Sequence, residues 1–239
     1  MAVKSEHSPR LGVDITKKLK GFELEIAFEA GVGCLGILGP SGCGKSMTLK
    51  SIAGIETPGA GRIALQYASG EAACGRVLYD SRLKVNLKPQ ERRVGYLFQS
   101  YALFPNMTVE ENIMTGLSGK YFRGGNKTPA GRREVAESMM KRFCLEGLGK
   151  RYPCQLSGGQ QQRVAIARAL IAQPDIIFAD EPTGNLDNRS GSEVMEVLKN
   201  IWEDMDKSLV IITHDSRIAR MAKRQFHITD GVLSEVTAG

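Results

Sequence analysis

The chain has 239 residues and a mass of 26.0 kDa; 42% of the residues are hydrophobic and 24% are charged. A chain of this size and composition can bury its own hydrophobic core without disulfides or structural metals. No apolar run reaches the roughly 18–20 residues that a membrane span requires, and the N-terminus lacks the apolar core of a signal peptide. These features predict a soluble, cytoplasmic protein.

Charge and cysteine content narrow the function classes further. The five cysteines form no C-x-x-C pair, which argues against a disulfide framework or a zinc ribbon. The formal net charge of +6 raises nucleic-acid binding as one possibility. However, the basic residues are scattered, with small clusters only at 17–18, 92–93 and 132–133. This pattern disfavours nucleic acid as a partner, and anionic lipid or plain solubility explains the charge as well.

Alternation of apolar and polar residues predicts strands in the first part of the chain. The predicted strands lie at 22–28, 35–38, 62–65 and 76–79. The alternating ones are typical of half-buried strands in an antiparallel sheet. The apolar run at 35–38 instead leads into a glycine-rich turn and a helix at about 44–53. Residues 68–75 are predicted to form a loop.

Strands and helices alternate in the rest of the chain, which predicts a largely parallel sheet flanked by helices. Thr108 and Glu111 have the spacing of a capping box, so a helix is expected to begin at Thr108. Residues 118–131 are predicted to form an exposed linker, and Asp230–Gly231 the turn of a C-terminal hairpin. The other predicted elements are strands at 94–98, 175–179 and 208–213 and helices at 131–143, 157–172 and 190–203.

One segment matches the phosphate-binding pattern G-x-x-x-x-G-K-S. It consists of Gly39, Pro40, Ser41, Gly42, Cys43, Gly44, Lys45 and Ser46. Glycines let successive backbone N–H groups point at phosphate oxygens, and the following helix adds its positive N-terminal end. Lys45 would reach the β- and γ-phosphates of a nucleotide, and the Ser46 hydroxyl would bind Mg²⁺. ATP and Mg²⁺ are therefore the expected cofactors.

A strand that ends in two carboxylates is predicted to complete this chemistry. Residues 175–179 are followed by Asp180 and Glu181. A parallel strand would place Asp180 at the carboxyl edge of the sheet, beside the phosphate loop, where it would hold Mg²⁺. Glu181 is suited to act as the general base that activates water. Acidic residues often close strands, so this pattern gains meaning only together with the phosphate loop.

The segment Leu156-Ser-Gly-Gly-Gln160 decides between families of phosphate-loop ATPases. Ser157 and Gln160 alone could form a capping box at the start of a helix. A capping box does not explain Gly158 and Gly159, which cost helix stability in the first turn. A backbone that must approach an anion closely explains them better. With this segment, the sequence resembles the ABC transporter ATP-binding family, whose signature is LSGGQ.

The resemblance extends in family order along nearly the whole chain and assigns three further residues. Gln99 matches the glutamine of the family's Q-loop, which contacts Mg²⁺ and water. Asp187 matches the family's D-loop, near the dimer interface, and His214 matches the switch histidine that hydrogen-bonds the γ-phosphate. Alone, each would be interpreted as an ordinary loop, turn or structural residue.

The resemblance also implies a fold and an assembly. The implied fold is an α/β P-loop ATPase core with a mainly parallel sheet, an N-terminal antiparallel β subdomain and a helical subdomain at about 100–156, all in a single domain over 1–239. The implied assembly is an ATP-sandwich homodimer, in which Ser157, Gly158, Gly159 and Gln160 of one copy close over the ATP of the other. Transmembrane permease subunits, and for import a substrate-binding protein, would be the other partners. They would hold the chain at the cytoplasmic face of the membrane.

One position departs from the family's pattern. The family stacks adenine on an aromatic residue upstream of the phosphate loop, and Leu19 stands at the matching place, with Phe22 nearby. An apolar rather than π-stacked contact with adenine is therefore expected. Cys43 has no evident chemical duty within the phosphate loop, and we expect its alkylation to block ATP binding.

The two halves of the chain resemble different transporters. The first half is similar to the ATPases of molybdate and sulfate importers, at 75–81, 92–98 and 103–109. The second half is similar to those of macrolide-export and lipoprotein-release systems, at 180–187 and 213–219. The extra C-terminal regulatory domain common in oxyanion importers is not expected in a chain that stops at Gly239. We favour an importer of molybdate or a related oxyanion, with the exporter ATPase as the alternative.

Soluble ABC ATPases that act on DNA or ribosomes form a third class. DNA-repair members carry long coiled coils between phosphate loop and signature, for which the stretch from Ser46 to Leu156 leaves no room. Ribosome-associated members carry two cassettes in one chain, and this sequence has one. Both observations disfavour this class.

Overall fold

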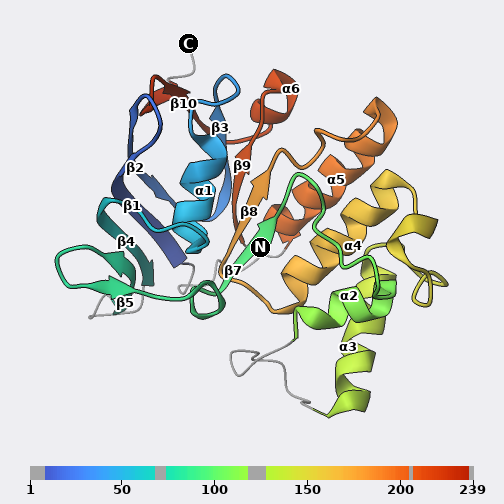
Figure 1. Cartoon of the computed structure of the whole chain (residues 1–239). Helices are drawn as coiled ribbons and strands as arrows, with labels where there is room; N and C mark the ends of the chain where they lie inside the picture. Colours follow the sequence, from blue (N-terminus) through green and yellow to red (C-terminus); the bar gives the residue numbers. More distant parts are fainter. Residues whose placement is uncertain (1–8, 68–73, 118–127, 205–206, 237–239) are drawn as a thin grey trace, which may run out of the picture. The chain divides into compact units, whose positions relative to one another are not determined.

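The computed structural model describes residues 9–67, 74–117, 128–204 and 207–236. They form two compact units, one made of the chain up to Arg92 and from Ile201 onward, and the other of Arg93–Asn200 (Figure 1). Within the described residues, every helix is too short or too polar to cross a bilayer.

The N-terminal part of unit 1 is an antiparallel sheet, as predicted. Its strands are β1 (Pro9–Lys18), β2 (Glu23–Ala30), β4 (Ala60–Tyr67), β5 (Cys74–Asp80) and β6 (Val85–Asn86), in the order β6-β5-β4-β1-β2. In β2, buried and exposed residues alternate strictly, which explains the period read from the sequence. The prediction missed β1, although its buried Leu11, Val13 and Ile15 show the same alternation.

The prediction of a loop at 68–75 is partly wrong. Cys74 and Gly75 already pair with Tyr67 and Gln66 in the β4–β5 ladder, so the strand begins earlier than its apolar residues indicate. The remainder of that loop, 68–73, lies outside the described residues.

Unit 1 also contains parallel strands. β3 (Gly33–Leu38) lies between β9 (Ser208–Ile212) and β10 (Arg224–Thr229), and both pairings are parallel. All five residues of β9 are buried, as expected for a central parallel strand. β10 turns at Asp230–Gly231, both with positive φ, into antiparallel β11 (Val232–Val236), which confirms the predicted hairpin. The helices of this part are α1 (Lys45–Ala53) and the short, unpredicted α6 (Ser216–Ala219).

Unit 2 combines two parallel strands with helices. β7 (Val94–Leu97) pairs in parallel with β8 (Ile176–Asp180). The helices are α2 (Val109–Thr115), α3 (Pro129–Arg142), α4 (Gly158–Ile171) and α5 (Asn188–Asp204), the last of which runs on into unit 1. Two short 3₁₀ turns, η1 (Pro89–Glu91) in unit 1 and η2 (Pro153–Gln155) in unit 2, were not predicted.

The start of α2 confirms the predicted capping box. The Thr108 hydroxyl accepts a hydrogen bond from the Glu111 N–H, and the Glu111 carboxylate accepts one from the Thr108 N–H at 2.7 Å. The predicted linker at 118–131 is too long at its end, because α3 begins at Pro129 with Thr128 as its cap. Residues 118–127 lie outside the described residues.

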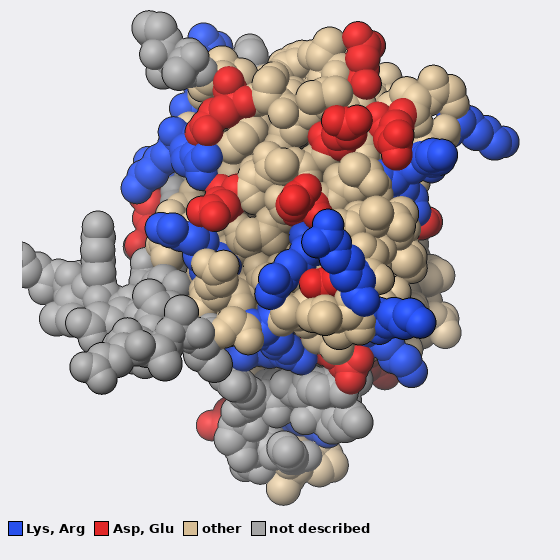
Figure 2. Space-filling view, turned by 90° about the vertical axis from the view of Figure 1, so that its left-hand side faces the viewer, with Lys and Arg blue, Asp and Glu red and all other residues tan. Residues whose placement is uncertain are grey.

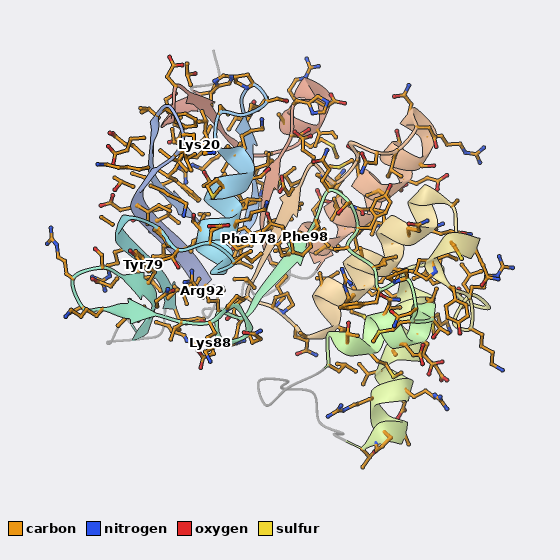
Figure 3. All side chains as sticks on the ribbon, in the orientation of Figure 1. Lys20, Tyr79, Lys88, Arg92, Phe98 and Phe178 are labelled. Atoms are coloured by element: carbon orange, nitrogen blue, oxygen red, sulfur yellow. The ribbon has the colours of Figure 1, made fainter. Side chains whose placement is uncertain are left out.

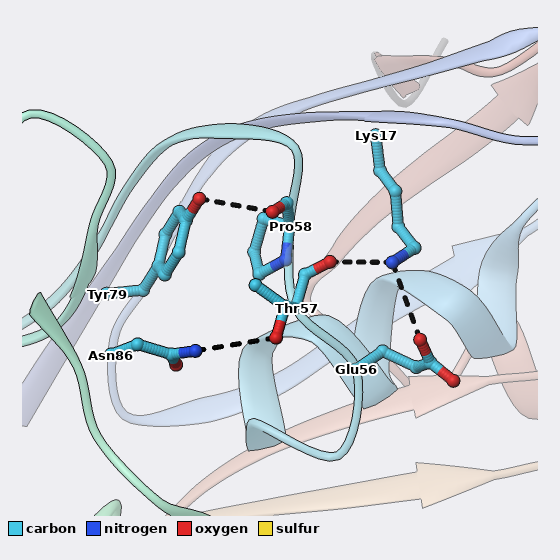
Figure 4. Close-up of polar contacts among 6 residues, drawn as sticks. All are labelled: Lys17, Glu56, Thr57, Pro58, Tyr79 and Asn86. Carbon is cyan, nitrogen blue, oxygen red and sulfur yellow. Dashed lines mark hydrogen bonds and ion pairs between the residues drawn. The ribbon is translucent and has the colours of Figure 1, made fainter. Parts of the chain in front are cut away.

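The segment that follows α1 is tied to two strands of unit 1 (Figure 4). The Lys17 ammonium donates to the carbonyl oxygen of Thr57 at 2.6 Å and pairs with Glu56 at 3.4 Å. The Tyr79 hydroxyl donates to the Pro58 carbonyl oxygen at 3.1 Å. These contacts come from β1 and β5, so the exit of α1 has a fixed path.

Arg92, which belongs to one of the small basic clusters in the sequence, is fully buried. Its guanidinium donates to the carbonyl oxygens of Ser51 and Ile52, at 3.0 and 2.7 Å, at the C-terminal end of α1 (Figure 3). It also donates to the Leu87 carbonyl oxygen and to the Asn86 side chain. Desolvation lowers the pKa of Arg92 to about 10, which leaves it charged at neutral pH. Its charge therefore offsets the negative end of α1.

On the face shown in Figure 2, the charged side chains of the described residues are of both signs. Figure 2 shows Lys and Arg interspersed with Asp and Glu over that face. In unit 1, Arg10 pairs with Glu29, and Arg62 with Asp80, both at 3.7 Å. This mixture fits the scattered basic residues noted in the sequence.

We predict that Arg92→Met lowers the free energy of unfolding by about 3 kcal/mol or more, because it removes the donor from several buried carbonyl oxygens at once. Urea titration followed by circular dichroism measures the change. The matched control is Arg10→Met, whose side chain is 65% exposed and whose loss should cost under about 1 kcal/mol. Equal stability of the two variants would contradict the role of Arg92.

Candidate functional site

The phosphate-loop segment of unit 1 connects β3 to α1 with a backbone that requires glycine. Gly39 has φ +152°, and a Cβ there would lie 2.7 Å from the carbonyl oxygen of Ile228 on β10. Gly42 has φ +84°, with open space where its Cβ would be. A side chain is therefore excluded by a neighbouring strand at Gly39, and disfavoured by backbone strain alone at Gly42.

Lys45 places a buried positive charge at the start of α1. Its side chain is 7% exposed, and its ammonium donates to the carbonyl oxygens of Gly39 and Pro40 at 2.7 and 2.9 Å. The first turn of α1 contains no acidic residue that would neutralise the helix N-terminus. Ser46 follows at the second position of the helix. A loop of this kind offers backbone N–H groups, a helix terminus and an ammonium to an anion.

His214 lies at the same edge of the unit 1 sheet as this loop. β3 and β9 are parallel, with Ile37 opposite Ile212, so the chain leaves the two strands side by side at Gly39 and His214. The Thr213 N–H donates to the Ile37 carbonyl oxygen at 3.2 Å, which extends the pairing to the residue before His214. The His214 side chain is exposed. The structure thus brings together the two predicted site elements of unit 1.

The same arrangement occurs in unit 2 with Gln99, Asp180 and Glu181. In the parallel pair β7–β8, Leu97 is opposite Ala179, so Gln99 and Glu181 leave the sheet at the same edge. Asp180 is 5% exposed, whereas the Gln99 side chain is exposed. Glu181 has φ +49°, a left-handed conformation that is costly for a residue with a side chain. Such strain often marks functional positions.

The signature segment begins α4 with the capping box that the sequence allowed. The Ser157 hydroxyl accepts from the Gln160 N–H at 3.3 Å, and the Gln160 side-chain oxygen accepts from the Ser157 N–H at 3.0 Å. The glycines have a packing reason within this unit. A Cβ on Gly158 would lie 3.1 Å from Leu186, and one on Gly159 would lie 3.3 Å from Ser190. Close packing against the 184–190 segment thus explains two glycines that the sequence linked only to an anion.

Asp187 serves as an N-cap for α5. Its carboxylate accepts from the N–H groups of Arg189 and Ser190, both at 3.0 Å, and from the Ser190 hydroxyl at 2.8 Å. The hydrogen bonds from Ser190 lower the pKa of Asp187. Two residues earlier, the Asn185 amide donates to the Gln99 carbonyl oxygen at 2.8 Å, so the predicted Q-loop and D-loop are in contact.

Arg168 on α4 holds the chain just after Gln99. Its guanidinium donates to the carbonyl oxygens of Tyr101 and Ala102 at 2.9 and 2.7 Å, and it lies over the ring of Phe104. Tyr101 and Ala102 both have positive φ, at +61° and +49°. Two successive strained residues are therefore held in place by one planar group on the signature helix. Arg168 was not among the predicted site residues, because nothing in its spacing indicates a backbone partner.

Leu19, which matches the family's adenine-stacking position, and Cys43 of the phosphate loop both lie in unit 1. Leu19 lies in the β1–β2 turn, where its N–H donates to the Phe22 carbonyl oxygen at 2.9 Å, and its side chain is half-buried. Cys43 is 8% exposed. A Cβ on Gly39 would meet the Cys43 sulfur at 2.8 Å, so this thiol packs against the start of its own loop.

These two units together contain the elements of a P-loop nucleotide-binding fold: a glycine loop between strand and helix, and a second parallel strand that ends in carboxylates. The comparisons with known proteins agree. The ABC transporter family model matches residues 24–184. The ATP-binding cassette MJ0796, solved as a dimer bound to ADP and Pi, is 32% identical with a TM-score of 0.72, and the match covers 97% of this chain and 100% of that one. The chain belongs to the ABC transporter ATP-binding family.

Two curated relatives illustrate the range of the family. The Fe(3+) ions import ATP-binding protein FbpC of Brucella abortus is 40% identical over 84% of this chain and 53% of its own length. The ABC transporter ATP-binding protein YtrE of Bacillus subtilis is 38% identical over 90% of this chain and 86% of its own. The chain thus spans about half the length of the iron importer relative and most of the length of YtrE.

Both transporter resemblances noted in the sequence are found among the relatives. The molybdenum import ATP-binding protein ModC of Rhodospirillum rubrum is 34% identical over 92% of this chain and 56% of its own length. The macrolide export protein MacB of Syntrophobacter fumaroxidans is 35% identical over 94% of this chain and 29% of its own. Identity alone therefore does not separate import from export.

We predict that Arg168→Lys loosens the segment after Gln99, because lysine lacks the planar guanidinium fork whose two ends donate to the Tyr101 and Ala102 carbonyl oxygens. Amide hydrogen exchange at residues 99–104 should become about tenfold faster, as expected for the loss of one or two hydrogen bonds of this strength. Arg163→Lys, on the same helix, is the control and should leave exchange there unchanged. Unaltered exchange in Arg168→Lys would show that Arg168 does not hold the segment after Gln99 in place.

Proposed function

We propose that this chain binds and hydrolyses ATP as the nucleotide-binding subunit of an ABC transporter. The observation that carries the proposal is the buried Lys45 ammonium, held by two carbonyl oxygens within a glycine loop at the N-terminus of α1. A buried cation at the N-terminus of a helix favours an anion with several oxygens, such as a triphosphate. Family membership and the ADP-bound relative give the nucleotide class.

The residues present fit Mg²⁺ as the partner of ATP. Asp180 is a buried carboxylate at a strand end, and Ser46 offers a hydroxyl in the first turn of α1. No cluster of three or more His, Cys, Asp or Glu that could hold a metal occurs among the described residues. Mg²⁺ commonly uses one or two carboxylates together with waters and substrate phosphates. In this proposal Ser46, Gln99 and Asp180 would bind the ion, which would supply charge neutralisation at the phosphates.

The remaining site residues take roles in binding and hydrolysis. The backbone of residues 39–46 and the Lys45 ammonium hold the phosphates. Glu181, at the strand end next to Gln99, accepts the proton of the attacking water, which Gln99 helps to orient. His214, at the end of β9, hydrogen-bonds the γ-phosphate.

A second copy would complete the site. We infer that Ser157, Gly158, Gly159 and Gln160 of one copy close over the ATP held by the other, with Asp187 near the interface. The exposed Ser157 side chain at the N-terminus of α4 and the dimeric MJ0796 relative support this arrangement. Closure on ATP and opening after hydrolysis would drive permease subunits through the helices of 100–156, at the cytoplasmic face of the membrane.

The cargo class that we propose is an inorganic ion taken up from outside. The iron and molybdenum import proteins match over most of this chain, and we propose import of molybdate or a related oxyanion, with a substrate-binding protein as a partner. The MacB match favours the alternative of an exporter ATPase. Co-purification of the chain with its permease, followed by mass spectrometry, decides between them: importer permeases arrive with a binding protein, and exporter permeases do not.

The general base gives the sharpest test of hydrolysis. Glu181→Gln should retain ATP binding and accumulate as an ATP-bound dimer. Its turnover should fall by more than ~10²-fold, because water is no longer activated. Phosphate release and size-exclusion chromatography with ATP measure both effects. Glu193→Gln, an exposed change on α5, is the matched control and should behave as wild type. Normal turnover in Glu181→Gln would remove Glu181 from this role.

A further inference from the structure

Tyr96 on β7 lies beside the strand that ends in Asp180. In the parallel register, Tyr96 is opposite Phe178, two residues before Asp180. Because side chains alternate between the faces of a strand, Phe178 and Asp180 share a face. The Tyr96 ring packs between Phe98, with centroids 4.4 Å apart, and Phe178, at 6.5 Å (Figure 3 labels both phenylalanines).

The position of this ring brings its hydroxyl to the Asp180 carboxylate. Tyr96 Oη donates to Asp180 Oδ2 at 3.1 Å. Both partners belong to the same compact unit, and Asp180 is 5% exposed. A hydrogen bond to a buried carboxylate is worth more than one between neutral groups. The two aromatic neighbours restrict the ring, so the hydroxyl has little freedom to point elsewhere.

We propose that Tyr96 is a positioning residue for Asp180, fixing the rotation of the carboxylate so that it is ready to bind Mg²⁺ with ATP. This inference rests on the proposed function, because it takes Asp180 as the Mg²⁺ ligand. Groups that orient a metal ligand commonly change metal affinity by ~10–100-fold when they are removed. Tyr96 thus affects the ion through Asp180 and does not touch the reacting atoms.

The test is the Mg²⁺ dependence of nucleotide binding in the full-length chain. Fluorescent N-methylanthraniloyl-ATP is titrated first in EDTA and then with increasing Mg²⁺. Tyr96→Phe should raise the Mg²⁺ concentration for half-maximal enhancement about tenfold or more, with the affinity in EDTA unchanged. Asp180→Asn should raise this Mg²⁺ concentration at least as much. Adding Tyr96→Phe to Asp180→Asn should raise it no further.

Tyr79→Phe is the matched control. Its buried hydroxyl donates to the Pro58 carbonyl oxygen at the same 3.1 Å, far from Asp180 in the sequence and in the other unit. It should leave the Mg²⁺ dependence as in wild type. The inference is overturned if Tyr96→Phe keeps the wild-type Mg²⁺ dependence while Asp180→Asn loses it, and the proposed function then stands. If Asp180→Asn also keeps it, both the inference and the proposed role of Asp180 are overturned.

Discussion

The parallel pairing of buried strands is the constraint on which the candidate site depends. Parallel strands end at the same edge, so whatever follows each strand is brought close to its neighbour's continuation. In unit 1, Ile37 pairs with Ile212, so Gly39 and His214 follow their strands at the same edge of the sheet. In unit 2, Leu97 pairs with Ala179, so Gln99 and Glu181 do the same. A shift of one residue in either register would turn these side chains to the opposite face.

Three partly or fully buried cationic side chains donate hydrogen bonds to backbone carbonyl oxygens rather than to carboxylates. Lys45 donates to its own loop, Arg92 to the end of α1, and Arg168 to the chain after Gln99. Carbonyl dipoles satisfy the N–H groups without cancelling the charge, so the backbone is fixed and the field of the cation persists. At Lys45 that remaining charge is what an anionic ligand would meet. Arg92 and Arg168 stabilise the segments that follow the phosphate loop and Gln99.

Much of the architecture could be predicted because it depends on local patterns. The hairpin at Asp230–Gly231 and the capping box at Thr108 follow from turn and cap chemistry, and the central strands follow from apolar runs. The environment of the Arg92–Arg93 cluster could not be predicted, because sequence cannot tell a solvated arginine from a buried one. Arg92 is fully buried, and Arg93 pairs with Asp175 at 2.7 Å. Their partners lie elsewhere in the chain, and only the fold brings them near.

The candidate site was predictable to the extent that glycines and strand ends reveal it. The positioning contacts were not, since Tyr96 and Arg168 look like ordinary strand and helix residues until their partners are known. The roles of Gly158 and Gly159 could be predicted only in part. The sequence suggested that their backbone approaches an anion, and the structure shows in addition that they pack closely against Leu186 and Ser190. We propose that two copies share each nucleotide, which the exposed Ser157 side chain and the dimeric MJ0796 relative support.

A mixing experiment tests that claim most directly. Lys45→Ala removes the phosphate-binding ammonium of a copy, and Ser157→Arg blocks the helix terminus that would seal its partner's nucleotide. Each variant alone should fail to hydrolyse ATP. A mixture should regain activity, because a mixed dimer contains one pocket with both groups intact. Full-rate hydrolysis by Ser157→Arg alone, in a preparation shown to be monomeric, would contradict the shared pocket.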